Sequence, residues 1–474
     1  MKKKLLSVIL STAMIASVLS GCGGNDGGSA STPATDNVAS TDDAAPADDA
    51  APADDAAPAD DAADSASSGD KFYIYSWNTE LQERLAYVFA ANPGMEDRVE
   101  YVNVGDSGIY QERIDQLLQA PDAEDYPDII AFEAAYIMKY TNSDQTLPIT
   151  DLGLSESDLG EMYPYTITVA TDKRNGSIKG LSWQACPGAF MYRTDLAESL
   201  LGVTSPEEMQ AKISTWDDFV ATAHEIKDKS GDATRILSSN GDIAEVFRSN
   251  MENPWVDDSG VFRMDPIMEQ YMDMCKTLEE EDLTQKTTTW TDEWNAGPST
   301  DAVFGYFGCT WFLHWTIKAN CGGSAVGEGT YGLWNMCQGP MPYYWGGTWL
   351  GATAGCSDKE LAGQIMKSLC CDTEIMTTMS SETLDYVNNK TAMQTLSDQG
   401  AGAYDFLGGQ DFIAVFSPLA DNVDVSFMSA YDQKVNDLLG TQITEYSLGN
   451  KDKETAIADF KSAVAEAFPS LTFE

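Results

Sequence analysis

The stretch that decides the fold opens the folded part of the chain, where residues 72–77 read FYIYSW. Aromatic and β-branched residues in such a run are typical of a β-strand. Leu81, Leu85 and Val88 follow at helical spacing, and Asn92-Pro93-Gly94 ends the predicted helix. A strand followed directly by an amphipathic helix is the repeating unit of an α/β fold.

The same alternation continues along the chain. Residues 99–104 predict a second strand, residues 114–118 a second helix, and residues 128–132 (DIIAF) a buried third strand. This order predicts a parallel sheet with helices on both faces. Ligands of such sheets bind beyond the carboxyl ends of the strands. Trp77 and Glu133, which lie at these ends, are therefore candidate cleft residues.

Helix starts recur far beyond this first unit. Ser205-Pro-Glu-Glu208 carries a cap, a first-turn proline and an acidic residue at the expected offsets. Thr215-Trp-Asp-Asp218 and Ser357-Asp-Lys-Glu360 begin two more predicted helices. The alternation resumes after Pro340, so no unrelated module follows the first. The sequence from Asp70 onwards is too long for one simple core and predicts two α/β lobes.

The N-terminal residues predict export and anchoring. Residues 1–21 have the basic start, apolar run and small-residue end of a signal peptide. Leu19-Ser-Gly-Cys22 resembles the bacterial lipobox, in which the cysteine is acylated and becomes the new N-terminus. Residues 22–69 are mainly Gly, Ser, Ala, Asp and Pro without an aromatic residue, which predicts a disordered linker. We expect a lipid-anchored protein on the extracellular face of the cell membrane.

The net charge limits the possible partners. The formal charge of −47 would repel phosphate backbones and anionic lipid headgroups. Nucleic acid is therefore excluded as a partner, and polyanionic substrates are disfavoured.

The cysteines and histidines predict neither a metal site nor a cofactor. Eight cysteines follow Cys22, but no Cys-x-x-Cys spacing occurs, and His224 and His314 are the two histidines. This set does not match the ligand spacing of a zinc site. A bond between the adjacent Cys370 and Cys371 would be strained, so we expect free thiols there. The sequence leaves the state of the other cysteines open.

Motifs of enzymes are missing. The sequence contains no Gly-x-Ser-x-Gly, His-Glu-x-x-His or Walker loop. Acidic residues are so abundant that a glycosidase pair can be drawn almost anywhere, with Glu133 or Asp292 as examples. A secreted glycoside hydrolase or lyase stays as the alternative to a binding protein. An adhesin or structural surface protein is a third possibility, which is disfavoured because such a protein needs no hinge.

The eleven tryptophans carry a clearer signal. Many stand beside Gly, Asn, Gln or Pro, and residues 343–349 read YYWGGTW. Sugar rings have an apolar face and a polar rim, so their sites combine flat aromatic walls with amides and carboxylates. For any single Trp, burial in the core explains the residue as well as ligand contact does. The pairs Trp290/Trp294 and Trp311/Trp315 have helical spacing, which is also typical of a core face.

Several motifs, in their order along the chain, resemble one known family. They are Tyr126-Pro-Asp-Ile-Ile130, Leu181-Ser-Trp-Gln-Ala-Cys-Pro-Gly188, Met191-Tyr-Arg-Thr-Asp195, Thr215-Trp-Asp-Asp-Phe219, Gly346-Gly347-Thr348 and Phe406-Leu-Gly-Gly-Gln410. The chain is similar to extracellular solute-binding proteins of family 1, the carbohydrate-binding components of bacterial ABC importers and relatives of maltose-binding protein.

This resemblance implies a periplasmic-binding-protein-like fold of two α/β lobes that close around a ligand at a hinge. It implies crossings between the lobes near residues 182–187 and 339–342. The first lobe would comprise residues 70–184 and 341–385, and the second residues 185–340 and 386–474. The implied protein is a monomer that binds a sugar without catalysis and delivers it to permease subunits. The acidic charge favours a neutral oligosaccharide.

The resemblance also implies a set of ligand-binding residues. Glu133 corresponds to a position with polar groups for sugar hydroxyls, Trp183 and Gln184 to the hinge side of the cleft, and Trp255 and Trp311 to second-lobe walls. The segment from Tyr343 to Trp349 would re-enter the first lobe at the cleft, with bare backbone at its glycines. The alternative is that these glycines only bend a strand. The full predicted set is Trp77, Glu133, Trp183, Gln184, Trp255, Trp311, Trp345, Gly346, Gly347 and Thr348. Trp349 is the alternative to Trp345 as the ring that faces the ligand.

Overall fold

The structure is a computed structural model that describes residues 71–105 and 107–474. The predicted signal peptide, Cys22 and the linker lie outside the described residues. The strands are β1 (Phe72–Ser76), β2 (Val99–Asn103), β3 (Ile129–Glu133), β4 (Leu181–Ser182), β5 (Gly188–Arg193), β6 (Val261–Phe262), β7 (Gly305–Cys309), β8 (Trp334–Cys337), β9 (Thr348–Ala352) and β10 (Thr472–Phe473).

The helices are α1 (Glu80–Ala91), α2 (Ser107–Leu118), α3 (Ile137–Thr141), α4 (Pro164–Val169), α5 (Thr194–Leu196), α6 (Pro206–Lys212), α7 (Trp216–Lys229), α8 (Ala244–Arg248), α9 (Pro266–Glu280), α10 (Asp292–Ala296), α11 (Thr310–Phe312), α12 (Lys359–Cys371), α13 (Thr373–Thr383), α14 (Lys390–Asp398), α15 (Phe412–Ala420), α16 (Asp432–Ser447) and α17 (Lys453–Ala467). In the part of the chain that is described, none is both long and apolar enough to cross a bilayer.

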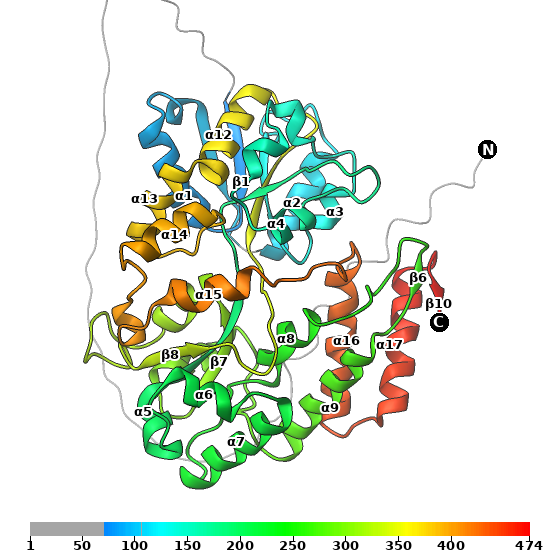
Figure 1. Cartoon of the computed structure of the whole chain (residues 1–474). Coiled ribbons are helices and arrows are strands. Elements are labelled where there is room, and N and C mark those ends of the chain that lie inside the picture. The colour runs from blue at the N-terminus through cyan, green and yellow to red at the C-terminus, as the bar shows by residue number, and fades with distance from the viewer. Residues whose placement is uncertain (1–70, 106) are drawn as a thin grey trace, which may run out of the picture. The chain divides into compact units, whose positions relative to one another are not determined.

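The first lobe is built on a mixed sheet with the strand order β2-β1-β3-β9-β4. β1 pairs in parallel with β2 and β3, as the alternation of strands and helices predicts. The prediction of a fully parallel sheet is wrong, because β9 runs antiparallel to both β3 and β4. α1 and α13 lie on one side of β1, and α2 and α3 lie on the other (Figure 1).

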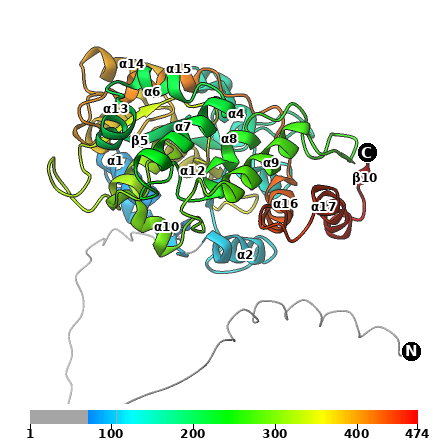
Figure 2. The same cartoon turned by 90° about the horizontal axis from the view of Figure 1, so that it is seen from below.

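The second lobe contains an antiparallel sheet in the order β7-β5-β8. Next to β7 the sheet is continued by bridges from Arg235 to Val303 and from Leu237 to Thr284. α9, α16 and α17 lie side by side (Figures 1 and 2). They form the part of the lobe that carries the C-terminus.

The chain passes between the two sheets several times. Residues 183–187 connect β4 to β5, and residues 338–347 connect β8 to β9. A third segment runs beside them, because Asn388 donates from its backbone N–H to the carbonyl of Trp183 (2.8 Å) and from Nδ2 to the carbonyl of Ser182 (3.0 Å). The crossing segments are therefore hydrogen-bonded to one another where they pass between the lobes.

Local signals place the helix starts as the sequence predicts. Ser205 accepts a hydrogen bond from the backbone of Glu208 (3.3 Å), and Thr215 accepts one from Asp218 (3.1 Å). At the third predicted start the cap is Asp358 rather than Ser357. Cys370 and Cys371, which close this helix, are free thiols in the described structure.

Candidate functional site

A cavity of about 600 Å³ is lined by residues of both lobes, a size within the usual range for small-molecule sites. In the first lobe its walls begin where β1 and β3 end. In the second lobe they come from α8, α11 and α16. The lining residues are Trp77, Asn78, Thr79, Glu80, Gln111, Glu133, Ala134, Ala135, Tyr136, Gln184, Glu245, Arg248, Ser249, Trp290, Trp311, Trp315, Tyr344, Trp345, Gly346, Gly347, Thr348, Phe427, Met428, Asp432, Gln433, Asn436 and Asp437.

Most of the predicted binding residues meet at this cavity. Strand pairing explains part of the convergence, because the register of β3 and β9 places Glu133 opposite Thr348 at the end of the sheet. The predicted residues that line the cavity are Trp77, Glu133, Gln184, Trp311, Trp345, Gly346, Gly347 and Thr348. Their contact with a ligand stays a prediction.

Two predicted rings lie elsewhere. Trp183 is fully buried, and its indole nitrogen has no hydrogen-bond partner among the described residues. Trp255 is also buried, stacks on Phe262 at 5.9 Å between centroids, and donates from Nε1 to Asn436 (3.0 Å). Both rings are packed in the interior, so we do not retain them as lining residues. Trp255 acts one layer behind the wall, because its partner Asn436 faces the cavity.

The alternative ring Trp349 does not reach the cavity either. It is buried, and its Nε1 donates to the backbone carbonyl of Thr166 (2.8 Å). Successive side chains of a strand point to opposite faces. This alternation along β9 explains why Thr348 lines the cavity while the next residue, Trp349, does not.

The aromatic wall consists of three indoles. Trp311 and Trp345 meet edge to face with ring centroids 5.4 Å apart, and Nε1 of Trp311 donates to the carbonyl of Trp345 (3.2 Å). Trp290 packs on both, at 6.3 Å from Trp311 and 5.8 Å from Trp345. The sequence pattern treated Trp290 as one of a helical pair, but α10 begins after it, at Asp292. The ring packs against Trp294 of α10 at 4.9 Å between centroids, yet it stays half exposed.

Bare backbone brings a carboxylate and an indole together at Gly346. Its φ of 67° lies in the left-handed region that favours glycine. A Cβ built on Gly346 would lie 3.0 Å from Oε1 of Glu133 and 3.1 Å from Nε1 of Trp311. The glycine thus leaves room for a first-lobe acid and a second-lobe ring to converge on one point of the wall.

Polar side chains join the cavity to the crossing segments. Nε2 of Gln184 donates to Oε1 of Glu80 (2.5 Å), and Oε1 of Gln184 accepts from the backbone N–H of Thr348 (3.2 Å). Beneath Glu80, the buried Arg84 donates to both carboxylate oxygens of Asp385, at 2.6 and 3.2 Å. Glu80 is therefore hydrogen-bonded to the crossing segment through Gln184, and Arg84 of the same helix is bound to Asp385.

The cavity is more acidic than the aromatic motifs alone suggest. Among the described residues that line it, Arg248 is the one basic side chain, and its Nη1 is paired with Glu245 at 2.6 Å. Glu80, Glu133, Glu245, Asp432 and Asp437 are its acids. The residues from α8 and α16 were missed in the sequence, because no motif marks which face of these helices meets the cleft.

Burial shifts the pKa of four of these acids upwards, Asp437 among them. It raises the pKa of Glu133 to about 7, with Glu245 nearby adding to the effect and the N–H of Ala135 opposing it. It raises the pKa of Glu80 to about 8, helped by Asp385 and opposed by Arg84. The pKa of Asp432 rises to about 6 for the same reason, although Ser429 donates to this carboxylate.

These shifts predict how stability depends on pH. An acid whose pKa is higher in the folded state contributes stability below its unfolded pKa of about 4.5, and this is lost as the pH rises through the folded value. For Glu133 and Glu80 the loss spans about pH 4.5 to 8.

We therefore expect the melting temperature of the ligand-free protein to fall between about pH 5 and pH 8.5. Glu133→Gln should flatten this fall, and the exposed Glu112→Gln should leave it unchanged. The buried His314, whose pKa is lowered by burial, contributes in the opposite direction and reduces the net slope. A melting temperature that rises with pH in the wild type would contradict the assignment of these raised pKa values.

Comparison with known proteins shows that this chain shares its fold with solved solute-binding proteins. Among solved structures, an extracellular solute-binding protein of family 1 has 17% identity and a TM-score of 0.71, with 84% of this chain and 99% of that chain covered. The binding protein associated with an ABC transporter of B. animalis subsp. lactis Bl-04, solved with β-1,6-galactobiose, has 18% identity and a TM-score of 0.68 (85% and 99% covered). Maltose-bound MalE3 of T. maritima has 16% identity and a TM-score of 0.64 (84% and 100% covered).

At these identities, the solved structures establish the two-lobed α/β fold and nothing more. A comparison with curated proteins finds no match. The family comparison goes further, because residues 89–402 match the description "bacterial extracellular solute-binding protein". This match runs through both sheets and through the segments that cross between them. The chain belongs to the bacterial extracellular solute-binding proteins.

Proposed function

We propose that the protein captures a carbohydrate in the cavity between its lobes and delivers it to an ABC importer, without catalysis. The observation that carries this proposal is a cavity lined by Trp290, Trp311 and Trp345 together with carboxylates and amides. Indole faces suit the apolar side of a sugar ring, and the acids accept hydrogen bonds from its hydroxyls. Similar proteins in complex with β-1,6-galactobiose and lacto-N-biose support the same class of ligand.

The charge of the cavity supports a neutral sugar over an anionic one. An acidic ligand would meet several carboxylates, and the guanidinium of Arg248 is already paired with Glu245. We propose the lobe boundaries implied by the family, residues 70–184 with 341–385 and residues 185–340 with 386–474. Closure of these lobes around the sugar would occur at the crossing segments.

A thermal-shift screen over neutral and acidic glycans tests the proposal. A ligand of the folded state raises the melting temperature by mass action, by an amount that grows with concentration over Kd. We expect a neutral oligosaccharide to give the largest shift and to change tryptophan fluorescence. A uronic acid that gives the largest shift would contradict the charge argument, and a non-sugar solute as the best ligand would contradict the carbohydrate proposal.

A glycoside hydrolase is the second candidate, because the raised pKa values of Glu80 and Glu133 suit a general acid. Both functions predict sugar binding, so turnover is the measurement that separates them. We expect each bound oligosaccharide to remain intact after prolonged incubation. Hydrolysis that Glu133→Gln or Glu80→Gln abolishes would establish the enzyme instead.

We also propose that Cys22 carries the lipid that holds the protein at the extracellular face of the membrane, as a monomer. The support is the sequence Leu19-Ser-Gly-Cys22 after the apolar run. Radiolabelled palmitate should enter the wild-type protein in cells and be absent from Cys22→Ala. A variant that is still labelled would show that the anchor lies elsewhere.

A further inference from the structure

The segment that connects α15 to α16 supplies part of the cavity wall (Figure 1). It comprises residues 421–431, which we call the strap, and its described backbone forms neither a helix nor a strand. Phe427 and Met428 of the strap line the cavity and are buried. Since no regular secondary structure holds the strap, its position depends on contacts with its neighbours.

A lysine of the first lobe contacts the strap. Nζ of Lys173 donates to the backbone carbonyl of Met428 (2.5 Å). Lys173 lies between α4 and β4, and β4 belongs to the sheet of the first lobe, whereas the strap continues into α16 of the second lobe. A hydrogen bond with a charged donor is stronger than one between neutral groups. This bond therefore joins the two lobes next to the cavity.

The hairpin that carries Lys173 is held in place within the first lobe. The backbone N–H of Lys173 donates to Oδ1 of Asn142 (2.8 Å). The preceding residue, Asp172, is fully buried and pairs with the buried Lys179 at 2.9 Å. The backbone of Lys173 is thus fixed, and only its side chain must be ordered to reach the strap. A donor on a fixed backbone loses less entropy than one on a free loop.

Met428 and its neighbour are also bound on the side of the second lobe and the crossing segments. The hydroxyl of Tyr344 donates to Sδ of Met428 (2.6 Å). Ser429 donates from its N–H (2.9 Å) and its hydroxyl (2.5 Å) to the carboxylate of Asp432. Burial raises the pKa of Asp432, and the charge of Lys173 is among the influences that oppose this rise. The ammonium of Lys173 therefore acts on the strap and on an acid of the cavity.

We propose that Lys173 is a positioning residue that holds the strap against the first lobe along one side of the cavity and thereby slows the release of a bound ligand. This inference rests on the proposed capture of a ligand between the lobes. The ammonium must leave the carbonyl of Met428 when the lobes separate, so the bond stabilises only the state in which the strap covers the cavity. An interaction that is lost on opening acts mainly on the dissociation rate.

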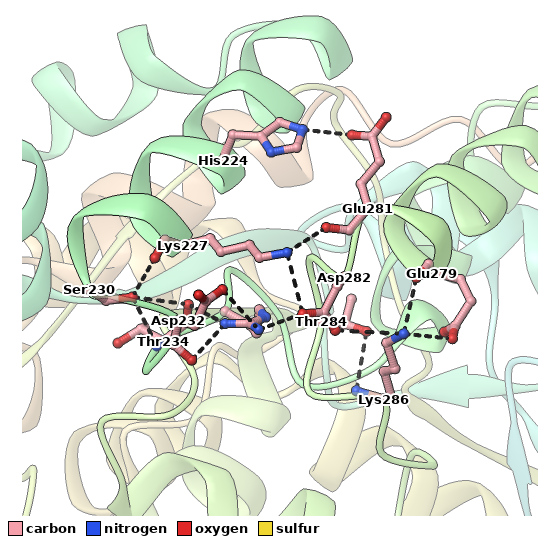
Figure 3. Close-up of polar contacts among 11 residues, drawn as sticks. His224, Lys227, Ser230, Asp232, Thr234, Glu279, Glu281, Asp282, Thr284 and Lys286 are labelled. Atoms are coloured by element: carbon pink, nitrogen blue, oxygen red, sulfur yellow. Dashed lines mark hydrogen bonds and ion pairs between the residues drawn. The ribbon is translucent and has the colours of Figure 1, made fainter.

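The test compares three variants. Lys173→Met removes the ammonium and keeps an unbranched side chain, and Lys173→Arg restores a cationic donor. Lys227→Met is the matched control. Nζ of Lys227 also donates to a backbone carbonyl, that of Glu281 (2.8 Å), and pairs with Asp282 (3.3 Å) (Figure 3). These three residues belong to the second lobe and lie outside the lining of the cavity.

Two measurements report the strap and the ligand separately. Hydrogen–deuterium exchange of residues 421–431 in the ligand-free protein reports how often the strap opens. Stopped-flow tryptophan fluorescence with maltose, β-1,6-galactobiose and lacto-N-biose gives association and dissociation rate constants. Melting curves report the fold of each variant.

We expect Lys173→Met to exchange the strap and to release the bound sugar about threefold to tenfold faster than the wild type, with little change in the association rate. Lys173→Arg should stay close to the wild type. Lys227→Met should leave both the exchange of the strap and the dissociation rate unchanged, even where its melting temperature falls.

Unchanged exchange of the strap in Lys173→Met would overturn the inference, and so would an equal increase in Lys227→Met, which would indicate general loosening of the fold. Faster exchange with an unchanged dissociation rate would overturn the role of Lys173 in ligand release. A wild type that binds none of the three sugars would instead count against the carbohydrate proposal. Exchange of the strap, which needs no ligand, would still decide whether Lys173 holds it.

Discussion

Arg84→Met is expected to unfold with a free energy about 3–5 kcal/mol below that of the wild type, because it leaves buried carboxylates without their cation. Arg84 and Asp385 are both buried and share two hydrogen bonds, at 2.6 and 3.2 Å. Glu80, also buried, lies close enough that Arg84 lowers its pKa. Methionine fills a similar volume but neutralises neither acid. Chemical denaturation measures the loss.

Two further variants separate charge from packing at this site. Combining Arg84→Met with Asp385→Leu removes both members of the pair and should recover much of the lost stability, since two apolar groups need no partner. Lys71→Met breaks an exposed pair with Glu100 (2.6 Å) and should change stability by less than about 1 kcal/mol. A single Arg84 variant as stable as the Lys71 variant would show that the buried pair contributes little.

Gly346→Ala is expected to weaken sugar binding about tenfold to a hundredfold. The new Cβ would stand 3.0 Å from Oε1 of Glu133 and 3.1 Å from Nε1 of Trp311, so the carboxylate, the indole or both must shift. A displacement of groups that are predicted to contact the ligand should cost more affinity than the lost space alone. Titration of tryptophan fluorescence measures the change.

Gly94→Ala is the control for backbone strain. Gly94 has a φ of 89°, and a Cβ there would meet nothing within 4 Å. Both substitutions force an alanine into the left-handed region at a cost of about 1–2 kcal/mol, so both should lower the melting temperature. Only Gly346→Ala should lose affinity. Equal affinities for the two variants would remove Gly346 from the site.

The fold follows from local patterns, which explains why it could be predicted. The strand at residues 72–77 and the helix after it depend on periodicity and turn residues, and the structure places β1 and α1 there. Caps at Ser205 and Thr215 depend on side chains within three residues of the helix start. The direction of β9 could not be predicted in this way, because the sequence of a short strand does not indicate whether it will run parallel or antiparallel to a distant partner.

The site could be predicted only in part, for a similar reason. Residues at strand ends and in the crossing segments, such as Glu133 and Gln184, line the cavity because topology places them there. The indoles could not be sorted by sequence, since Trp255 and Trp290 both lie outside helices, yet one is buried and the other is half exposed. Side-chain burial depends on which helices from elsewhere in the chain cover each ring.

The position of β9 between β3 and β4 has a consequence for the order in which the chain matures. A chain that leaves the ribosome or crosses a membrane with its N-terminus first exposes β3 and β4 long before residues 348–352 emerge. Until then the two strands have no partner to join them, and the first lobe stays incomplete. Contacts between distant segments form slowly. Most of the second lobe must therefore be synthesised before the first lobe can finish folding.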